Sequence, residues 1–282
     1  KPNYISMIKF IFNQFAIASV FLISCNNHQT NHEKLKEVKN EIKSTVLNYK
    51  VDSVDYSGYI AYDSSNQNKR PVVFVIHEWW GQNEYVRRRA IKLAELGYFA
   101  VALDLYGVNK NAKSVEEAAA FSKPFYQNSD LALKNYKEAF SNLKQFAEAD
   151  TTQIAIIGYC FGGSMALELA RMGEHVSGVV SFHGGLAGRK TQKELLKAKV
   201  LVCHGADDQF VSKEEVDHFK NEMDSVHADY KFVVYPGATH AFSNPDATEW
   251  GKKFNIPIAY NQNADTSSWN EMKIFFQKIF QK

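Results

Sequence analysis

Residues 154–163 are Ile154-Ala155-Ile156-Ile157-Gly158-Tyr159-Cys160-Phe161-Gly162-Gly163. The apolar run predicts a buried strand, and the Gly-x-Cys-x-Gly turn leads directly into a helix predicted at residues 162–172. In such a nucleophile elbow the middle residue is held in a strained conformation on a tight turn. Its side chain is then exposed at the carboxyl edge of the sheet, where open α/β folds bind ligands.

Cys160 is the candidate nucleophile of this turn. The N-terminus of the following helix favours a thiolate, and the backbone N–H of Phe161 can stabilise an oxyanion. The alternative is a glycine-rich strand–helix turn around a buried structural cysteine. The spacing matches neither a P-loop nor a dinucleotide fingerprint, so we expect no cofactor.

Strands and helices alternate on both sides of this turn. Alternating polar and apolar residues predict an antiparallel segment at 51–62. Near-continuous apolar runs, which are typical of strands buried on both faces, occur at 71–77, 98–103, 153–158, 176–182, 200–204 and 230–235. Amphipathic patterns predict helices at 84–96, from the cap at 114, and at 130–147, 162–172, 212–224 and 268–280. The alternation predicts an α/β fold, and the nucleophile elbow is typical of the α/β-hydrolase fold within that class. We expect a mostly parallel central sheet with helices on both faces and antiparallel N-terminal strands, in one domain over residues 45–282.

Composition excludes several classes of protein. Of the 282 residues, 45% are hydrophobic and 23% are charged, which argues against disorder over most of the chain. A net charge of +2 is too small for a typical nucleic-acid binder, so we expect no nucleic-acid partner. Three cysteines are too few for a disulfide framework.

The N-terminal residues predict export. Lys9 precedes a short apolar run at 15–23, which is too short to span a membrane and is typical of a secretory signal. The run ends in Leu22-Ile23-Ser24-Cys25, which resembles the bacterial lipobox and so implies lipidation of Cys25. We expect a signal peptide with its upstream residues over 1–24 and a polar tether over 25–44. The chain would then be anchored by lipid in the bacterial envelope, facing the periplasm or the cell surface. The alternative is a buried N-terminal helix ending in an ordinary cysteine.

Two later loops offer an acid and a base. Asp207 and Asp208 follow the predicted strand at 200–204, and His240 follows the one at 230–235. A lone loop histidine is most often a surface residue. However, nucleophile, acid and histidine occur here in the order typical of α/β hydrolases, each just beyond a strand. This order favours a Cys-Asp-His triad and leaves both aspartates open.

The segment His77-Glu78-Trp79-Trp80-Gly81 ends the first central strand, where such folds place the second oxyanion-hole loop. Glu78 beside two tryptophans is expected to be desolvated, which raises a carboxyl pKa. Its alternative role is that of an acid at the start of the next helix. A second histidine of the zinc-binding His-Glu-x-x-His pattern is absent from this segment, so we expect no metal.

Together the motifs resemble the dienelactone hydrolase (carboxymethylenebutenolidase-like) family over residues 48–282. The similarity lies in His77–Gly81, Asp104-Leu105-Tyr106-Gly107, Gly158–Gly163, Gly205–Val211 and His240-Ala241-Phe242. The resemblance implies the following roles: nucleophile for Cys160, acid for Asp208, base for His240, thiol activation for Glu78, and oxyanion-hole N–H groups for Phe161 and Trp79. Asp208 matches the family acid because it lies three residues before Val211.

The sequence departs from the family in its substrate-binding residues. Asn244 stands where the family has an arginine that binds the substrate carboxylate, and Lys123 is the remaining candidate cation. Lysine does not replace arginine in a bidentate contact, so dienelactone itself is not the expected substrate. Trp80, Tyr106 and Phe242 are expected to line the pocket with these two residues.

We therefore expect a hydrolase of a small-molecule ester or lactone, as a monomer or small homo-oligomer. Two alternatives stay open: a non-catalytic ligand-binding lipoprotein on the same fold, and a thiol-redox protein that uses Cys160 and Cys203. A Cys-x-x-Cys motif is absent, and Cys203 lies within an apolar strand, which favours an inert thiol. Arg87–Arg89 are expected on a solvated helix face. The segment His183-Gly184-Gly185 is expected to shape the pocket floor.

Overall fold

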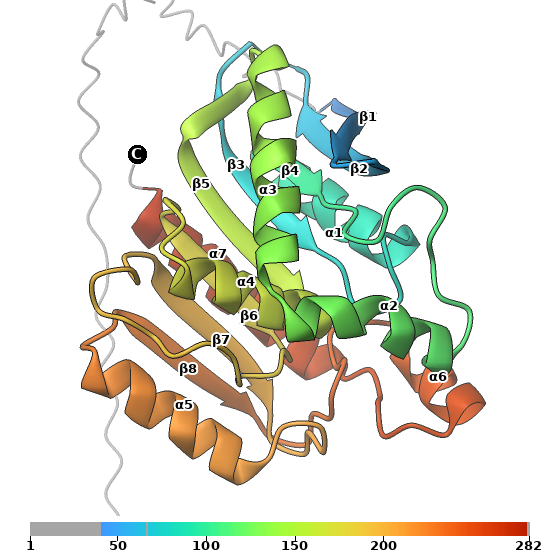
Figure 1. Cartoon of the computed structure of the whole chain (residues 1–282), viewed down its shortest axis with the longest axis vertical. Coiled ribbons are helices and arrows are strands. Elements are labelled where there is room, and N and C mark those ends of the chain that lie inside the picture. Colours follow the sequence, from blue (N-terminus) through green and yellow to red (C-terminus); the bar gives the residue numbers. More distant parts are fainter. Residues whose placement is uncertain (1–40, 66, 281–282) are drawn as a thin grey trace, which may run out of the picture. The chain divides into compact units, whose positions relative to one another are not determined.

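The computed structural model describes residues 41–65 and 67–280, in which the strands form one eight-stranded sheet of order β1-β2-β4-β3-β5-β6-β7-β8 (Figure 1). The strands are β1 Ile42–Val51, β2 Val54–Asp63, β3 Arg70–Ile76, β4 Phe99–Ala102, β5 Ala149–Tyr159, β6 Gly178–Phe182, β7 Lys199–Gly205 and β8 Tyr230–Tyr235. The β1–β2 and β2–β4 pairs are antiparallel, and the pairs from β4 to β8 are parallel. The predicted α/β-hydrolase architecture is confirmed.

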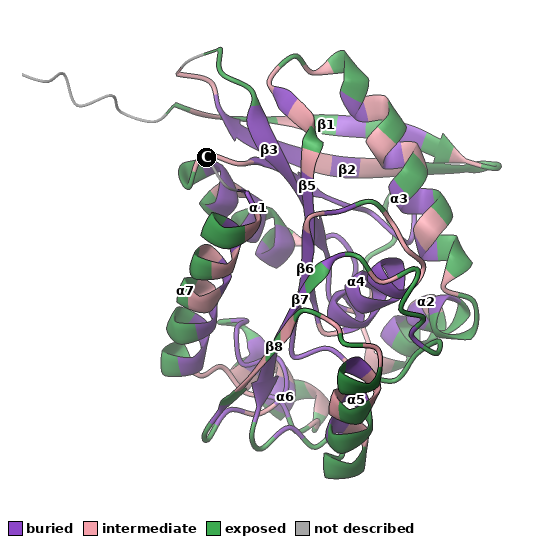
Figure 2. Ribbon diagram, turned by 90° about the vertical axis from the view of Figure 1, so that its left-hand side faces the viewer, coloured by how far each residue is buried: buried purple, intermediate pink, exposed green. Residues whose placement is uncertain are grey.

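Helices cover both faces of the sheet, which Figure 2 shows edge-on. They are α1 Glu84–Glu95, α2 Val115–Gln127, α3 Asp130–Asn142, α4 Phe161–Arg171, α5 Lys213–Ser225, α6 Ala247–Phe254 and α7 Gln262–Ile279, with a 3₁₀ turn η1 at Leu143–Gln145. Helices α1 and α7 pack on one face, and α3, α4 and α5 pack on the other. The central strand β3 is buried in all 7 residues, because alternate side chains enter the two cores.

Capping residues start the helices where the sequence predicts. The Ser114 hydroxyl accepts the N–H of Glu117 at the start of α2, and the Ser212 hydroxyl accepts the N–H of Glu215 at the start of α5. These bonds satisfy donors that have no partner inside the helix.

Several predicted boundaries are wrong. The helix predicted over 130–147 ends at Asn142, because η1 turns the chain into β5. Helix α6 was not predicted, and α7 begins six residues before the predicted start at 268. Strand β1 begins at Ile42 and pairs with β2, so residues 42–44 belong to the sheet and not to the tether. Only Leu47 and Tyr49 of β1 are buried, so its sequence lacks the apolar run by which the other strands were predicted.

The predicted signal segment 1–24, the lipidation site Cys25 and the tether up to residue 40 lie outside the described residues. Among the described residues, no helix is long and apolar enough to cross a membrane.

Close packing of α4 against β5 and β3 requires two glycines. A Cβ added at Gly158 would lie 1.9 Å from the carbonyl oxygen of Gly162. A Cβ added at Gly162 would lie 2.3 Å from the carbonyl oxygen of Ile76. Both obstacles are backbone atoms of packed elements, so neither can move aside cheaply.

We predict that Gly158→Ala lowers the free energy of unfolding by about 3 kcal/mol or more, because the methyl group overpacks this junction. The matched control is Gly97→Ala, where φ is +90° but nothing lies within 4 Å of the added Cβ. That variant should lose only about 1–2 kcal/mol through backbone strain. Urea unfolding followed by circular dichroism measures both, and equal losses would contradict the steric argument.

Candidate active site

Cys160 lies between β5 and α4 with φ 52° and ψ −118°, a conformation that is strained for a residue with a side chain. Its backbone N–H donates to the carbonyl of Phe182 at 3.0 Å and to Nδ1 of His183 at 3.1 Å. Phe161 is the first residue of α4, so its N–H has no acceptor inside the helix. The turn therefore presents a partly exposed thiol beside an available backbone donor.

His240 and Asp208 form a buried pair beside Cys160. Nδ1 of His240 donates to Oδ2 of Asp208 at 2.8 Å, and Oδ1 of Asp208 accepts the N–H of Phe210 at 2.9 Å. Burial opposes a charged His240, but interaction with Cys160 and the Asp208 carboxylate outweighs it and raises the His240 pKa to about 10. Asp207 is exposed, and its N–H bonds the carbonyl of Ala238. The structure thus pairs His240 with Asp208 rather than with Asp207.

Glu78 occupies the cavity wall as a buried acid. Burial raises its pKa to about 7, against the opposing effect of a hydrogen bond that its Oε2 accepts from the Asn244 amide at 2.7 Å. His77 fixes the loop that carries Glu78. Its Nε2 accepts the N–H of Leu105 at 3.2 Å, so its Nδ1 carries the proton and donates to the Glu78 carbonyl at 2.5 Å. Glu78 therefore changes its charge near neutral pH in a fixed loop.

A cavity of about 640 Å³ brings these groups together, with Cys160, His240 and Glu78 in its wall. Of the predicted pocket residues, Trp79, Trp80 and Lys123 also line it.

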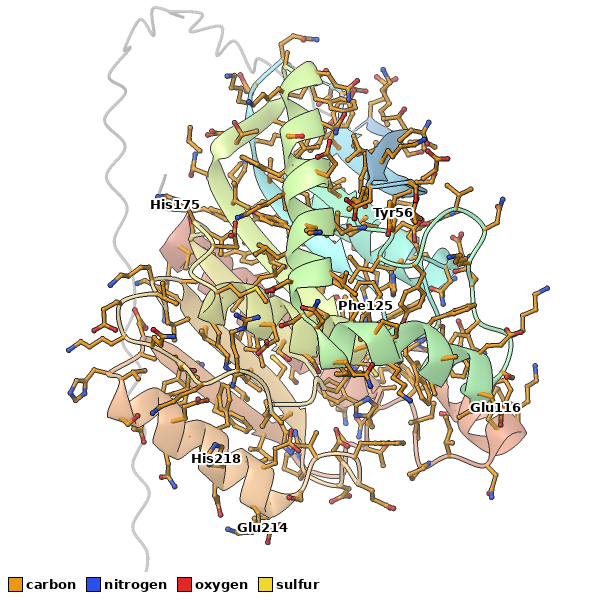
Figure 3. The ribbon with its side chains drawn as sticks, viewed as in Figure 1. Tyr56, Glu116, Phe125, His175, Glu214 and His218 are labelled. Atoms are coloured by element: carbon orange, nitrogen blue, oxygen red, sulfur yellow. The ribbon has the colours of Figure 1, made fainter. Side chains whose placement is uncertain are left out.

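Three other predicted pocket residues lie behind the wall. Tyr106 packs against Phe161, and its hydroxyl donates to the Trp79 carbonyl at 3.2 Å. Phe161 is itself fully buried and also packs against Phe125 of α2, which Figure 3 labels. Phe242 is fully buried, and Asn244 reaches the cavity only through Glu78. Tyr106 and Phe242 are core residues, because their side chains pack inside the two hydrophobic cores and do not line the cavity.

The structure adds cavity residues that sequence patterns did not place in the pocket: Tyr126, Ser164, Phe210 and Glu215. The sequence could have indicated Ser164, because Cys160 immediately precedes α4 and residues four apart on a helix share a face. The others come from separate loops and helices, so only the fold places them here.

His183 joins the nucleophile to the loop of His240. Since its Nδ1 accepts the Cys160 N–H, its Nε2 carries the proton and donates to Oγ of Ser243 at 2.7 Å. Burial and the nearby His240 hold the His183 pKa well below its usual range, which keeps this ring neutral. The prediction that His183-Gly184-Gly185 shapes the pocket floor holds for Gly185, which lines the cavity, but not for His183, which is fully buried behind Cys160.

Arg89 supports the same loop from α1. Its guanidinium donates to the Ser243 carbonyl and to the Asp265 carboxylate, and its Nε donates to the Tyr85 hydroxyl at 3.3 Å. The Tyr85 and Ser243 hydroxyls are in turn 2.8 Å apart. Arg89 is buried, which corrects its predicted place on a solvated face.

Cys203 differs from Cys160 in its burial and in lying outside the cavity. It is fully buried, and burial raises its thiol pKa to about 12. The Tyr235 hydroxyl contacts its sulfur at 3.6 Å. Within residues 41–65 and 67–280, no group of three or more histidine, cysteine or acidic side chains could hold a metal ion.

Comparison with known proteins gives consistent matches. The model of the "Dienelactone hydrolase family" matches residues 57–280. A Yersinia pestis protein assigned as a carboxymethylenebutenolidase is 28% identical over 206 residues, which cover 66% of this chain and 73% of that protein. Protein usf of Aquifex pyrophilus is 25% identical over 238 residues, covering 83% and 97%. A crystal structure of a dienelactone hydrolase-like promiscuous phosphotriesterase from metagenomic libraries is 30% identical, with a TM-score of 0.78 over 84% of this chain and 98% of that one.

We predict that His183→Ala lowers the rate of Cys160 alkylation by iodoacetamide at pH 7 about fivefold to tenfold and moves its pH midpoint upward. The variant loses the hydrogen bond from the Cys160 N–H to His183, worth about 1 kcal/mol, so the thiol is held less firmly beside His240. Mass spectrometry of the Cys160 peptide follows the reaction.

His183→Asn is the matched variant for this test. Asparagine tolerates the φ of 42° found at this position and retains an acceptor, so the alkylation rate should fall less. An unchanged pH profile in a folded His183→Ala protein would show that His183 only fills space.

We predict that Glu78 destabilises the fold as pH rises. The folded state keeps the Glu78 proton up to about pH 7, whereas the unfolded chain loses it near 4.5, so unfolding releases a proton between these values. Relative to Glu78→Gln, the wild type should lose up to about 3 kcal/mol of unfolding free energy over this window. Urea unfolding of both proteins at pH 4.5, 6 and 7.5 provides the measurement. A constant difference between them would contradict the raised pKa.

Proposed function

This chain belongs to the dienelactone hydrolase family, and from that premise we propose that it hydrolyses a small-molecule ester or lactone with Cys160 as the nucleophile. One observation carries the proposal. Cys160 on its strained turn and the Asp208-bound His240 share one cavity wall, and the Cys160–His240 interaction raises the histidine pKa. A thiolate beside an imidazolium is the arrangement that cysteine acyl transfer requires.

The reaction proceeds in two stages. The Cys160 thiolate adds to the substrate carbonyl, and the N–H groups of Phe161 and Trp79 stabilise the resulting oxyanion. His240 donates its proton to the leaving alkoxide as the C–O bond breaks, which leaves a thioester. His240 then takes a proton from water, the hydroxide adds to the thioester, and the thiolate leaves with release of the acid. Asp208 keeps the imidazole in the required tautomer throughout.

Glu78 gives this site a second proton acceptor near neutral pH. Its carboxyl group lies in the cavity wall with Cys160, and its pKa of about 7 lets it exist in both states at physiological pH. We infer that the ionised form assists deprotonation of the thiol. Asn244, which occupies the position of the family arginine, offers Glu78 only a neutral amide. The substrate we propose is therefore not dienelactone.

The range of electrophiles to screen is broad. A relative with 30% identity is described as a promiscuous phosphotriesterase, so neutral phosphotriesters belong beside esters and lactones in the screen. A thiol-redox role finds no support, because the Cys203 pKa of about 12 leaves that thiol unreactive at neutral pH. Export and lipidation at Cys25 stay predictions.

We predict that Cys160→Ala loses at least about 10³-fold in kcat/KM on p-nitrophenyl acetate, because the nucleophile is removed. Release of p-nitrophenolate is followed at 405 nm. Cys203→Ala is the matched control and should retain wild-type turnover, since Cys203 lies in the core outside the cavity. Undiminished hydrolysis by purified Cys160→Ala would exclude the cysteine mechanism.

A further inference from the structure

One end of the cavity contains a hollow between two oxygen atoms. A Cβ added at Gly185 would lie 3.2 Å from Oγ of Ser164 and 3.9 Å from Oε1 of Glu215. Ser164 lies on α4, Gly185 follows β6, and Glu215 lies on α5, and all three line the cavity that contains Cys160. Even a methyl group at Gly185 would press on Oγ of Ser164, so the absence of a side chain there keeps the hydroxyl and the carboxylate open to the cavity.

The Ser164 hydroxyl is unusually placed for a buried polar group. Ser164 is only 2% exposed, and within the described part of the chain its Oγ makes no hydrogen bond of ordinary distance and angle. Leaving a buried hydroxyl unpaired lowers stability, so such groups are uncommon unless a ligand or water completes them. Its N–H bonds the Cys160 carbonyl at 3.2 Å, which places Ser164 one helical turn beyond the nucleophile.

The Glu215 carboxylate is held in place and determines the charge of this hollow. Its Oε1 accepts the N–H groups of Leu186 at 2.6 Å and Ala187 at 2.9 Å. An ionised carboxylate only accepts hydrogen bonds and repels anions. Because Oε1 already accepts two N–H groups, a ligand would donate to the second carboxylate oxygen, Oε2. A ligand hydroxyl could donate to Oε2 and accept the Ser164 hydroxyl proton, and an amide could do the same with its N–H and its carbonyl oxygen. A carboxylate or phosphate dianion has no proton to donate and is repelled by Glu215.

Tyr126 connects this hollow to the nucleophile. Its ring lies edge-on to that of Phe161, the residue after Cys160, with the ring centroids 5.5 Å apart. Tyr126 lines the same cavity as Cys160, Ser164 and Glu215, so one phenol borders both the thiol and the hollow.

We propose that Ser164, Gly185 and Glu215 form a subsite for a neutral hydrogen-bond donor, such as a hydroxyl or amide N–H, carried by the substrate about one helical turn (~5.4 Å) from the scissile carbonyl. The subsite rests on the proposed function, since it names the substrate class as a neutral, hydroxylated or amide-bearing ester or lactone. It selects against acidic substrates through Glu215.

Binding to the inactive Cys160→Ala protein tests the subsite independently of turnover. Calorimetry would compare two nearly isosteric pairs: phenyl 3-hydroxypropanoate with phenyl butanoate, and 2-hydroxyethyl benzoate with propyl benzoate. We expect the hydroxylated member of at least one pair to bind about tenfold more tightly, the effect of one or two neutral hydrogen bonds. Adding Ser164→Ala or Gly185→Ala should abolish that preference.

Two further measurements sharpen the result. Ser164→Ala alone should raise the melting temperature, because it removes an unpaired buried hydroxyl. Glu215→Gln, which retains an oxygen for Leu186 and Ala187, should improve binding of monophenyl succinate relative to phenyl butanoate.

Equal affinities within both pairs, or a preference that survives both Ser164→Ala and Gly185→Ala, would overturn the subsite. Absence of ester hydrolysis by the wild type would instead overturn the proposed function, and the binding comparison would still decide the subsite.

Discussion

The close packing of β5 against α4 is the constraint on which the rest of the site depends. Glycines at 158 and 162 bring backbone against backbone, and the residue between strand and helix is forced to a φ of 52°. The turn places Cys160 in the cavity wall, and Phe161 as the first residue of α4 has an N–H without a helical acceptor. The strain persists because β5 and α4 are buried within two hydrophobic cores, and the fold as a whole stabilises it.

Parallel strands then decide what surrounds the thiol. The loops after β3, β5, β7 and β8 all leave the sheet at one edge, and they carry Glu78, Cys160, Asp208 and His240. The same edge holds the buried network in which His183 contacts the Cys160 N–H and Ser243. Arg89 of α1 donates to the Ser243 carbonyl and is itself paired with Asp265 of α7, and both helices lie on the opposite face of the sheet from α4. One buried network therefore joins the turn of Cys160 to the loop of His240.

Charge is distributed unequally across the site. Cys160 and Asp208 favour a protonated His240, burial keeps His183 neutral, and burial holds Glu78 near half-ionisation at neutral pH. All three side chains are buried, and burial disfavours the charged form of each. The charge that each one carries then depends on which charged groups lie nearby. A protonated His240 therefore lies on the same network as the buried cation of Arg89, which is paired with the Asp265 carboxylate.

The sequence by itself determined the fold class, the elbow at Cys160 and the order of acid and histidine, because apolar periodicity, glycine spacing and strand ends are local properties. It could not separate Asp207 from Asp208 without the family pattern, and it misplaced Arg89, Tyr106 and Phe242. The tertiary structure decided these points, since burial and hydrogen-bond partners depend on which distant segments pack together. Ser164, Gly185 and Glu215 illustrate the same limit: they meet only where a helix, a loop and a second helix converge.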